Sequence, residues 1–377
     1  MTRTPLLRPT LLPGLARVWR DAHTLQLGLD PLRAVLLDLP SPRLAEVLDL
    51  LDGRRPERTI LTRAADLGLP ADEVRTMLDL LHSAGFVVGG HTLLPPALPD
   101  EAVQRLTGEA TALALDAAGL PRRARRPPPT PAQVLRRRAA SRVVIAGRGR
   151  LAAAVCVALA ESGVGHVDPH LPGVVTSQEL PAGPLGPADV GRARVVAVAA
   201  AVRRAAPGTE TRPVRRGTAS LIVQCGFDEP VALLAAGHAR RRQAHLALSV
   251  REGAAVVGPL VPAGGRPCLN CLDLPRGERD AGWPAVAAQL GAPGPEPCSV
   301  ATALAATGYA VAEALTFLDG GAPQTLGSAV QIGAAGHFRR RTWSPHPDCG
   351  CARRRSKTTD MRRLVRRCEQ VESVLCG

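Results

Sequence analysis

Four of the nine cysteines in the 377-residue chain form two close pairs that could bind a metal ion. Cys268 and Cys271 are spaced C-x-x-C after a turn rich in proline and glycine, and Cys349 and Cys351 are spaced C-x-C. The thiolates of an extended C-x-C segment point to the same side. Because four thiolates suit a closed tetrahedral site, we predict one structural zinc ion, Zn2+, that joins two distant segments.

Two other interpretations of these cysteines stay open. The four could be unpaired buried thiols, as we expect for Cys156 and Cys225, or the C-x-x-C pair could be a redox site. The redox interpretation is disfavoured because the pair is not expected to open a helix, as redox pairs of this type do. His346 could replace one ligand, although the four cysteines are the preferred set.

A second candidate site is a glycine-rich turn between a predicted strand over 141–146 and a predicted helix over 151–163. Gly147, Gly149 and Ala152 fit the pattern G-x-G-x-x-[GA], which presents backbone N–H groups to a phosphate at a helix N-terminus. The same glycines could serve only close packing of strand and helix. In a dinucleotide site, Asp168 would be the residue that binds the ribose.

Composition limits the classes of partner. The chain is long enough for two domains and is 45% hydrophobic, which is enough to bury both. The net charge of +14 comes almost wholly from arginine. The many arginines could reflect a coding bias, or they could attract an acidic partner. Aromatic residues make up 2% of the chain, too few for base-stacking platforms, so nucleic acid is not the expected partner.

The sequence gives no sign of membrane association. No stretch near the N-terminus has the pattern of a signal peptide, and the longest apolar runs are far shorter than the roughly 20 residues that span a bilayer. We therefore expect a soluble cytoplasmic protein. Its cysteines should stay reduced there, which excludes a disulfide framework.

Residues 1–98 are predicted to form a small α+β domain. Alternating segments predict two strands, over 24–29 and 33–39. Capping and stop residues predict three short helices, over 41–53, 57–68 and 70–85. The segment 86–95 then predicts a hairpin wing. Strands followed by three helices and a wing are typical of a winged-helix domain.

The second domain is predicted to begin after a linker. A helix over 100–119 and a Pro/Arg-rich stretch make up residues 99–138, and residues 139–352 open with a βαβ unit. Further strands and a long helix predict a mostly parallel sheet with helices, an α/β fold. Residues 353–377 form a basic tail.

The segment 143–168 resembles the start of the ThiF-like, ubiquitin-activating fold, in which a glycine turn is followed by a helix and a second glycine motif at the spacing from Gly147 to Gly163. The helical segment 189–208 and the cysteine pairs are similar to the same family, so the resemblance covers residues 139–352. The segment 244–290, with WSPHPDCGC further on, is most similar to the ThiF-like proteins of azole-peptide biosynthesis. Those proteins are the leader-binding partners of a cyclodehydratase and carry a winged-helix peptide clamp in front.

Most residues that the family uses for adenylation are replaced in this chain. Two acids, an arginine and a lysine of the family fall on Leu171, Gly173, Ala182 and Arg194. Asp228 keeps its type and, with Gly147 and Gly149, completes the candidate nucleotide-binding set. Because adenylation depends on compensating the phosphate charge, we expect no catalytic residue, and ATP is a doubtful cofactor.

One candidate nucleophile remains. Cys298 directly precedes a predicted helix, whose N-terminus could lower the pKa of the thiol. No histidine or lysine lies near it in the sequence, so a loop thiol without catalytic function is the default interpretation.

The resemblance implies a scaffold subunit. The first domain would bind the leader of a precursor peptide, and the second would dock a YcaO-type cyclodehydratase that uses ATP to form azolines. The leader is expected to add a strand beside 86–95, in a groove lined by Arg75, Leu78, Leu81 and Val87, although each leucine or valine could equally be core. A homodimer is left open.

Two alternatives belong to other classes. The chain could be an ATP-dependent ThiF-like enzyme that activates a carrier protein or a peptide C-terminus. It could also be a winged-helix DNA regulator, but the third helix carries Asp72, Glu73 and Asp79, which disfavour a phosphate-lined groove.

Overall fold

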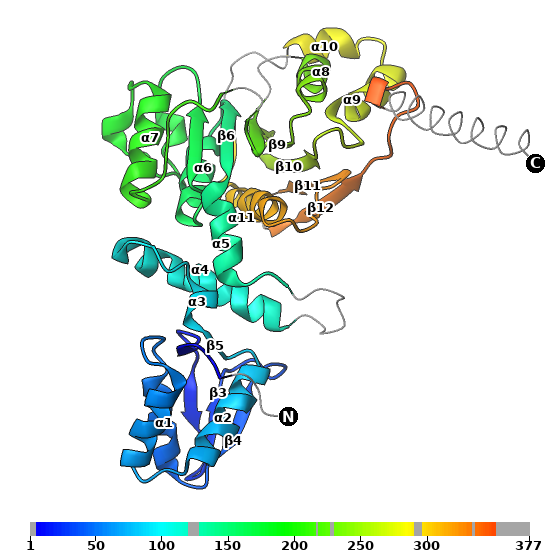
Figure 1. The fold of residues 1–377 in the computed structure, drawn as a ribbon. Helices are drawn as coiled ribbons and strands as arrows, with labels where there is room; N and C mark the ends of the chain where they lie inside the picture. The colour runs from blue at the N-terminus through cyan, green and yellow to red at the C-terminus, as the bar shows by residue number, and fades with distance from the viewer. Residues whose placement is uncertain are drawn as a thin grey trace, which may run out of the picture. The chain divides into compact units, whose positions relative to one another are not determined.

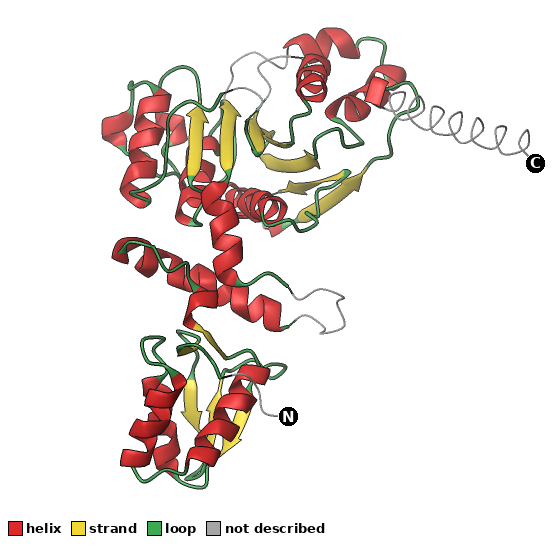
Figure 2. Cartoon of the chain, in the orientation of Figure 1, coloured by secondary structure: helices red, strands yellow, loops and turns green. Residues whose placement is uncertain are grey.

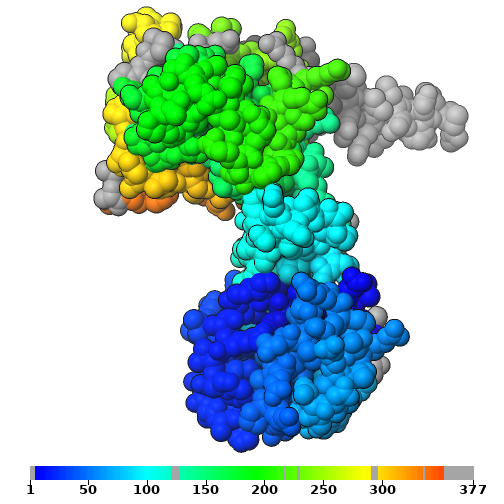
Figure 3. Space-filling view, turned by 90° about the vertical axis from the view of Figure 1, so that its left-hand side faces the viewer, coloured from blue at the N-terminus to red at the C-terminus, as the bar shows by residue number. Residues whose placement is uncertain are grey.

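The computed structural model describes residues 5–119, 128–215, 218–226, 230–289, 296–333 and 336–351. The chain divides into two compact units, Met1–Arg137 and Arg138–Gly377, and the division falls within helix α5 (Pro131–Ala140). Figure 1 labels the elements of both units, and Figure 3 colours the first unit blue to cyan. Helix α5 lies in a segment that the sequence predicted to be linker.

The first unit has a small antiparallel sheet and a leucine-rich core. Its strands β2 (Arg17–Trp19), β3 (Thr24–Leu27) and β4 (Val35–Asp38) pair in the order β2-β3-β4. The helices that follow are η1 (Pro42–Leu50), α1 (Glu57–Asp66), α2 (Ala71–Ser83) and, later, α4 (Asp100–Ala118). Gly68 and Gly85 follow α1 and α2 with φ of +77° and +79°, so both predicted stop signals are confirmed.

The first predicted helix differs from expectation in type and length. It is a 3-10 helix, begins after the capping residue Ser41, and ends at Leu50 before reaching Gly53. The amide of Gly53 donates instead to the carbonyl of Pro9, 3.1 Å away. Pairing with a distant strand therefore takes the last residues out of the helix.

The hairpin wing predicted over 86–95 is wrong. Strand β5 (Val87–Gly89) pairs antiparallel with β1 (Pro9–Leu11), and the short helix α3 (Gly90–Leu93) begins where the second hairpin strand was expected. Strand β1 buries Leu11, and Leu12 beside it is also buried. Burial of these apolar side chains stabilises the pairing of β1 with β5. Alternation within 86–95 could not reveal a partner strand so far away in the sequence.

The second unit is built on a seven-stranded sheet in the order β12-β11-β10-β9-β8-β6-β7. Its strands are β6 (Arg142–Gly147), β7 (His166–His170), β8 (Leu221–Cys225), β9 (His245–Arg251), β10 (Ala254–Val261), β11 (Ser328–Ile332) and β12 (Phe338–Thr342). Strands β7, β6, β8 and β9 are parallel, and β9 to β12 are antiparallel. The prediction of a mostly parallel sheet is corrected by the β9–β10 hairpin, whose turn residues Glu252 and Gly253 both have positive φ.

Helices cover both faces of this sheet (Figure 2). On β9, Leu246 and Leu248 belong to the large core with residues of α6 (Ala152–Glu161), α7 (Arg194–Ala205) and α11 (Val300–Leu318). The intervening Ala247 packs with α8 (Val231–Arg241) and α9 (Leu269–Arg279) on the opposite face. The described part of the chain also contains η2 (Ser177–Glu179), η3 (Pro187–Asp189) and α10 (Trp283–Gln289).

Helix α11 is, among the described helices, the one long and apolar enough to cross a membrane. Half of its apolar stretch is buried inside the protein, and its buried alanines belong to the large core. By packing, therefore, α11 is a core helix of the second unit.

The glycine motif after α6 has a structural cause. Gly163 adopts a φ of +94°, and a side-chain Cβ at Gly165 would lie 2.0 Å from the carbonyl oxygen of Ala139. Arg138, just before it, is buried and forms a 2.7 Å ion pair with Asp319 at the end of α11. These close contacts hold the start of the second unit, so the spacing of the motif serves the fold.

Two buried histidines stack between α8 and β9. The rings of His238 and His245 lie 4.1 Å apart, and neither ring nitrogen of His238 has a hydrogen-bond partner. Burial, with the neighbouring His245 adding to it, lowers the pKa of His238 to about 3, and burial lowers the pKa of His245 to about 4. Both rings are therefore neutral in the folded protein at neutral pH.

This pair predicts loss of stability in mild acid. As the pH falls below the ordinary histidine pKa of 6.5, the unfolded chain takes up protons that the folded chain does not bind, so stability falls. Between pH 7.5 and pH 5 the loss should be on the order of 1 to 2 kcal/mol for each ring. Urea unfolding of the wild type and of His238→Leu measures it: the variant should show a shallower pH dependence, and equal slopes would contradict the assignment.

Candidate functional site

The four cysteines predicted to bind zinc come together beside α9. The Sγ atoms of Cys268, Cys271, Cys349 and Cys351 all lie within 4.8 Å of one another. The separation is 3.3 Å between Cys271 and Cys351 and 3.6 Å between Cys268 and Cys349. With Zn–S bonds of about 2.3 Å, tetrahedral geometry sets sulfurs roughly 3.8 Å apart, so these residues fit a zinc ion.

Neighbouring groups support thiolate ligands. The side-chain amide of Asn270 donates to Cys349 Sγ at 3.6 Å, and the backbone N–H of His346 donates to Cys271 Sγ at 3.4 Å. The imidazole of His346 pairs with Glu278 instead, 2.9 Å away, so it is not positioned as a ligand. Such donors orient metal ligands and stabilise their negative charge.

One premise of the sequence analysis is wrong at this site. Cys268 is the N-cap of α9, so the C-x-x-C pair does open a helix. The argument against a redox pair therefore rests on the other two thiols, which lie as close to Cys268 and Cys271 as those two lie to each other, 3.9 Å. Because the four thiols lie together as one set of metal ligands, Cys268 and Cys271 do not form a separate redox pair.

The remaining described cysteines do not form a second cluster. Cys156 and Cys225 are buried, and burial raises the pKa of each thiol. Cys298 is half-buried, and burial raises its pKa too. The side chain of Ser299 caps α11 by accepting from the amide of Thr302, so Cys298 lies outside the helix start and is not an activated nucleophile.

We predict one zinc ion per chain in protein purified without added metal, measured by elemental analysis. Cys268→Ser should abolish zinc binding and lower the melting temperature of the second unit by roughly 10 °C or more, because metal binding stabilises the folded site. Cys298→Ser is the matched control and should retain zinc and stability. A folded wild-type chain without metal would contradict the prediction.

The glycine turn forms where the sequence predicted it, between β6 and α6. Gly147 and Gly149 have φ of +94° and +125°, which favour glycine. A Cβ at Gly147 would lie 2.2 Å from the carbonyl oxygen of Cys225 on β8. Gly147 is thus required by strand packing, whether or not a phosphate binds.

A carboxylate of the same chain occupies the anion position of this turn. Glu296 Oε2 accepts from the amide of Arg150 at 2.8 Å, and a Cβ at Gly149 would lie 3.0 Å from both carboxylate oxygens. The pKa of Glu296 is raised, chiefly by burial and with the charge of Glu179 adding to it, although the bond from Arg150 and the charges of Arg148 and Arg150 lower it. The amide just before α6 therefore already donates to a carboxylate of the same chain.

The positions that replace the family's adenylation residues have structural roles. Leu171 is buried in the core. Arg194 forms a nearly buried ion pair with Glu179, with bonds of 2.8 Å and 2.9 Å, and also donates to the carbonyl of Val174. Its guanidinium is bonded to the loop between β7 and α7, so these donors are already engaged within the protein. Gly173 and Ala182, in the same loop region, both have positive φ.

Asp168, one of the two candidate aspartates, is not placed in a nucleotide site. Asp168 is buried in β7 and accepts from the amide of Val214 at 2.8 Å, so it stabilises the fold and does not face a ribose. Asp228 lies outside the described residues. Sequence reasoning missed Glu296, because only the folded chain brings this acid to a turn almost 150 residues earlier.

The predicted peptide-groove residues separate into one surface residue and three core residues. Arg75 is exposed on α2. Leu78, Leu81 and Val87 have no exposed surface and pack in the core of the first unit. These three positions therefore offer no side chain for a peptide to contact.

No protein-family model and no curated protein matches the sequence. Solved structures do match the fold: E. coli MccB with ATP aligns with a TM-score of 0.60 and 15% identity, over 91% of this chain and 99% of that chain. The chain has the fold of MccB. The microcin C7 biosynthetic enzyme MccB in complex with N-formylated MccA matches with a TM-score of 0.57, at 15% identity and the same coverage. PaaA matches with a TM-score of 0.58 and 15% identity, over 88% of this chain and 98% of that chain.

The match to MccB confirms the predicted ThiF-like fold. It extends over nearly the full length of MccB and over 91% of this chain, and hence includes residues of both units. At this identity the likeness concerns architecture, and the chemistry of this chain is argued from its own residues.

Proposed function

We propose that this protein is a leader-peptide-binding subunit in the biosynthesis of a ribosomally made peptide, and that its ThiF-like unit does not form adenylates. The observation that carries the proposal is the Glu296 carboxylate at the glycine turn. A triphosphate at the same amides would meet a like charge. Leu171 and Ala182 add no charge that would offset it.

A sheet edge in the first unit is suited to an extended peptide. Strand β4 pairs with β3 on one side only, and Leu36 on it is 48% exposed. The amide of Leu39 donates to the carbonyl of His23, so by antiparallel alternation the backbone N–H and C=O of Leu36 point away from β3. An added strand could pair there. MccB complexes with MccA support a peptide as the partner.

The resemblance of the second unit to azole-peptide proteins supports a YcaO-type cyclodehydratase as the enzyme it docks. In this proposal the partner uses ATP, and the zinc-bound unit serves as a rigid docking body. Four metal ligands from two segments give that unit fixed surfaces without creating an open coordination position.

The second candidate function is an adenylating enzyme like MccB. It is favoured by the glycine turn, which keeps its two positive φ angles between β6 and α6, and by the match to MccB bound to ATP. It is opposed by Glu296 and by the engagement of Arg194 with Glu179. The scaffold function accommodates both sets of observations because the turn also packs the sheet.

Leader binding is tested with a proline at the β4 edge. Leu36→Pro removes an outward N–H without breaking the ladder to β3, whereas Leu36→Ala keeps it. Fluorescence polarisation of the full chain with the labelled leader of a candidate precursor peptide should show about tenfold weaker binding for the proline variant and little change for alanine. Equal affinity for a scrambled leader, or equal binding by both variants, would contradict strand addition at β4.

A further inference from the structure

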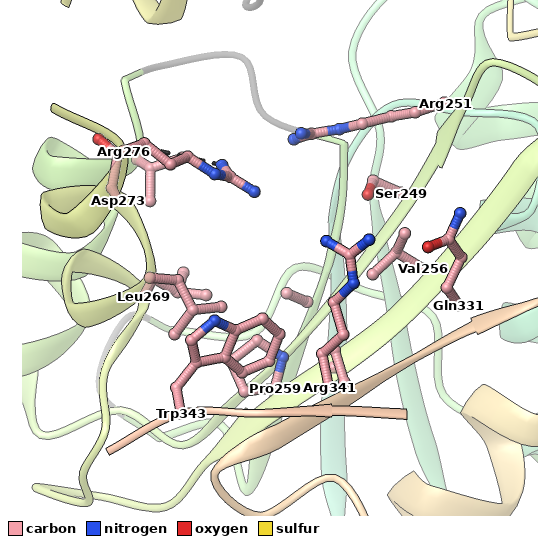
Figure 4. Close-up of a pocket in the computed structure, with 15 residues that line it drawn as sticks. Ser249, Arg251, Val256, Pro259, Leu269, Asp273, Arg276, Gln331, Arg341 and Trp343 are labelled. Carbon is pink, nitrogen blue, oxygen red and sulfur yellow. Dashed lines mark ion pairs between the residues drawn. The ribbon is translucent and has the colours of Figure 1, made fainter. Parts of the chain in front are cut away.

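A pocket on the second unit gathers three arginines from three separate elements. It has a volume of about 110 Å³ and lies between α9 and the strands β9 to β12. Arg251 ends β9, Arg276 is in α9 and Arg341 is in β12. Figure 4 shows the three guanidinium groups directed toward a common space. This is the sheet face opposite α6 and α11, because Arg251 alternates with Leu248 and Val250 along β9.

The pocket is lined mainly by positive charge. Asp273 is the single carboxylate among its described lining residues, beside three arginines. It lies 3.9 Å from Arg276 and also accepts from the indole of Trp283 at 2.8 Å. Burial, followed by the charge of Arg276, lowers the pKa of Arg251, and the acids Asp273 and Glu252 oppose this shift. Arg276 also lies over the ring of Trp283, 5.0 Å from its centre. Three positive charges therefore border one space, where an anion would be stabilised.

The rest of the lining defines the shape of a ligand. Ser249 and Gln331 add neutral hydrogen-bonding groups beside the guanidiniums. Val256, Pro259 and Leu269 form apolar walls, and Trp343 presents its ring on the side of β12. The pocket therefore suits a ligand with an anionic head and a less polar portion.

Strand β12 carries three consecutive arginines, of which one lines the pocket. Arg340 points to the other face, where it bonds to Ser328 and to the carbonyl of Gln324. Arg341 lines the pocket, whereas Arg339, which alternation places on the same face of this exposed strand, does not line it. The strand thus offers a lining arginine and a matched arginine outside the pocket.

We propose that this pocket binds an oxyanion, a carboxylate or a phosphate, through Arg251, Arg276 and Arg341. Guanidinium groups bind both kinds of oxyanion through paired N–H donors, so the shared chemistry is the inference. The site is separate from the glycine turn and from the β4 edge, and it does not depend on leader binding there.

The test uses the zinc-loaded full chain and isothermal titration at 0.15 M salt with three probes: inorganic phosphate, tetraglutamate and its neutral counterpart tetraglutamine, both peptides with acetylated and amidated ends. Phosphate or tetraglutamate should bind, and tetraglutamine should not. Binding of phosphate alone assigns a phosphate source, and binding of tetraglutamate alone assigns acidic side chains. If neither anion binds at 10 mM (roughly the limit of a weak specific site), the proposal is overturned.

Matched variants separate the pocket from the overall positive charge. Arg341→Gln should weaken anion binding at least about tenfold, and Arg339→Gln, with the same loss of charge, should change it by less than about twofold. Equal effects of the two would overturn the proposal. Zinc content and melting temperature check folding, and Arg276→Gln, from a different element, replaces Arg341→Gln if that variant does not fold.

Discussion

The meeting of four thiols from two segments some eighty residues apart is the constraint on which the functional half of the second unit depends. Cys268 and Cys271 fix the start of α9, and Cys349 and Cys351 fix the segment that follows β12. The arginine pocket is lined by residues of α9 and by Arg341 and Trp343, at the end of β12 and just after it. A zinc ion bound by the four cysteines, as we predict, would join the two segments and so limit how far their arginines can move apart.

Charge compensation explains the glycine turn as well. The fold places free amides at the start of α6, and such a helix end attracts an anion. In this chain Glu296 supplies it, and Arg194, at the start of α7, is bonded to Glu179. Glu296 and Arg194 therefore both stabilise the second unit. The chain has the architecture of MccB. In the function that we propose, Glu296 takes the place of a bound phosphate at the glycine turn.

What the sequence predicted well depended on short spacings. The strand, turn and helix around Gly147, the stops at Gly68 and Gly85, and the two close cysteine pairs each follow from residues a few positions apart. The β1–β5 pairing and the early end of η1 did not follow from such spacings, because each depends on contact with the N-terminal strand. Glu296 and the three pocket arginines likewise lie in unrelated segments, and only the folded sheet brings them together. Local patterns carry no record of such contacts.

The most direct test of the central claim, a ThiF-like fold without adenylation, is ATP–pyrophosphate exchange with Mg²⁺ and the precursor peptide. The account predicts background exchange for the wild type. It predicts background for Glu296→Ala too, because Leu171 and Ala182 still supply no charge for the phosphates. Peptide-dependent exchange by the wild type, well above a reaction without protein, would contradict it and identify the chain as an adenylating enzyme.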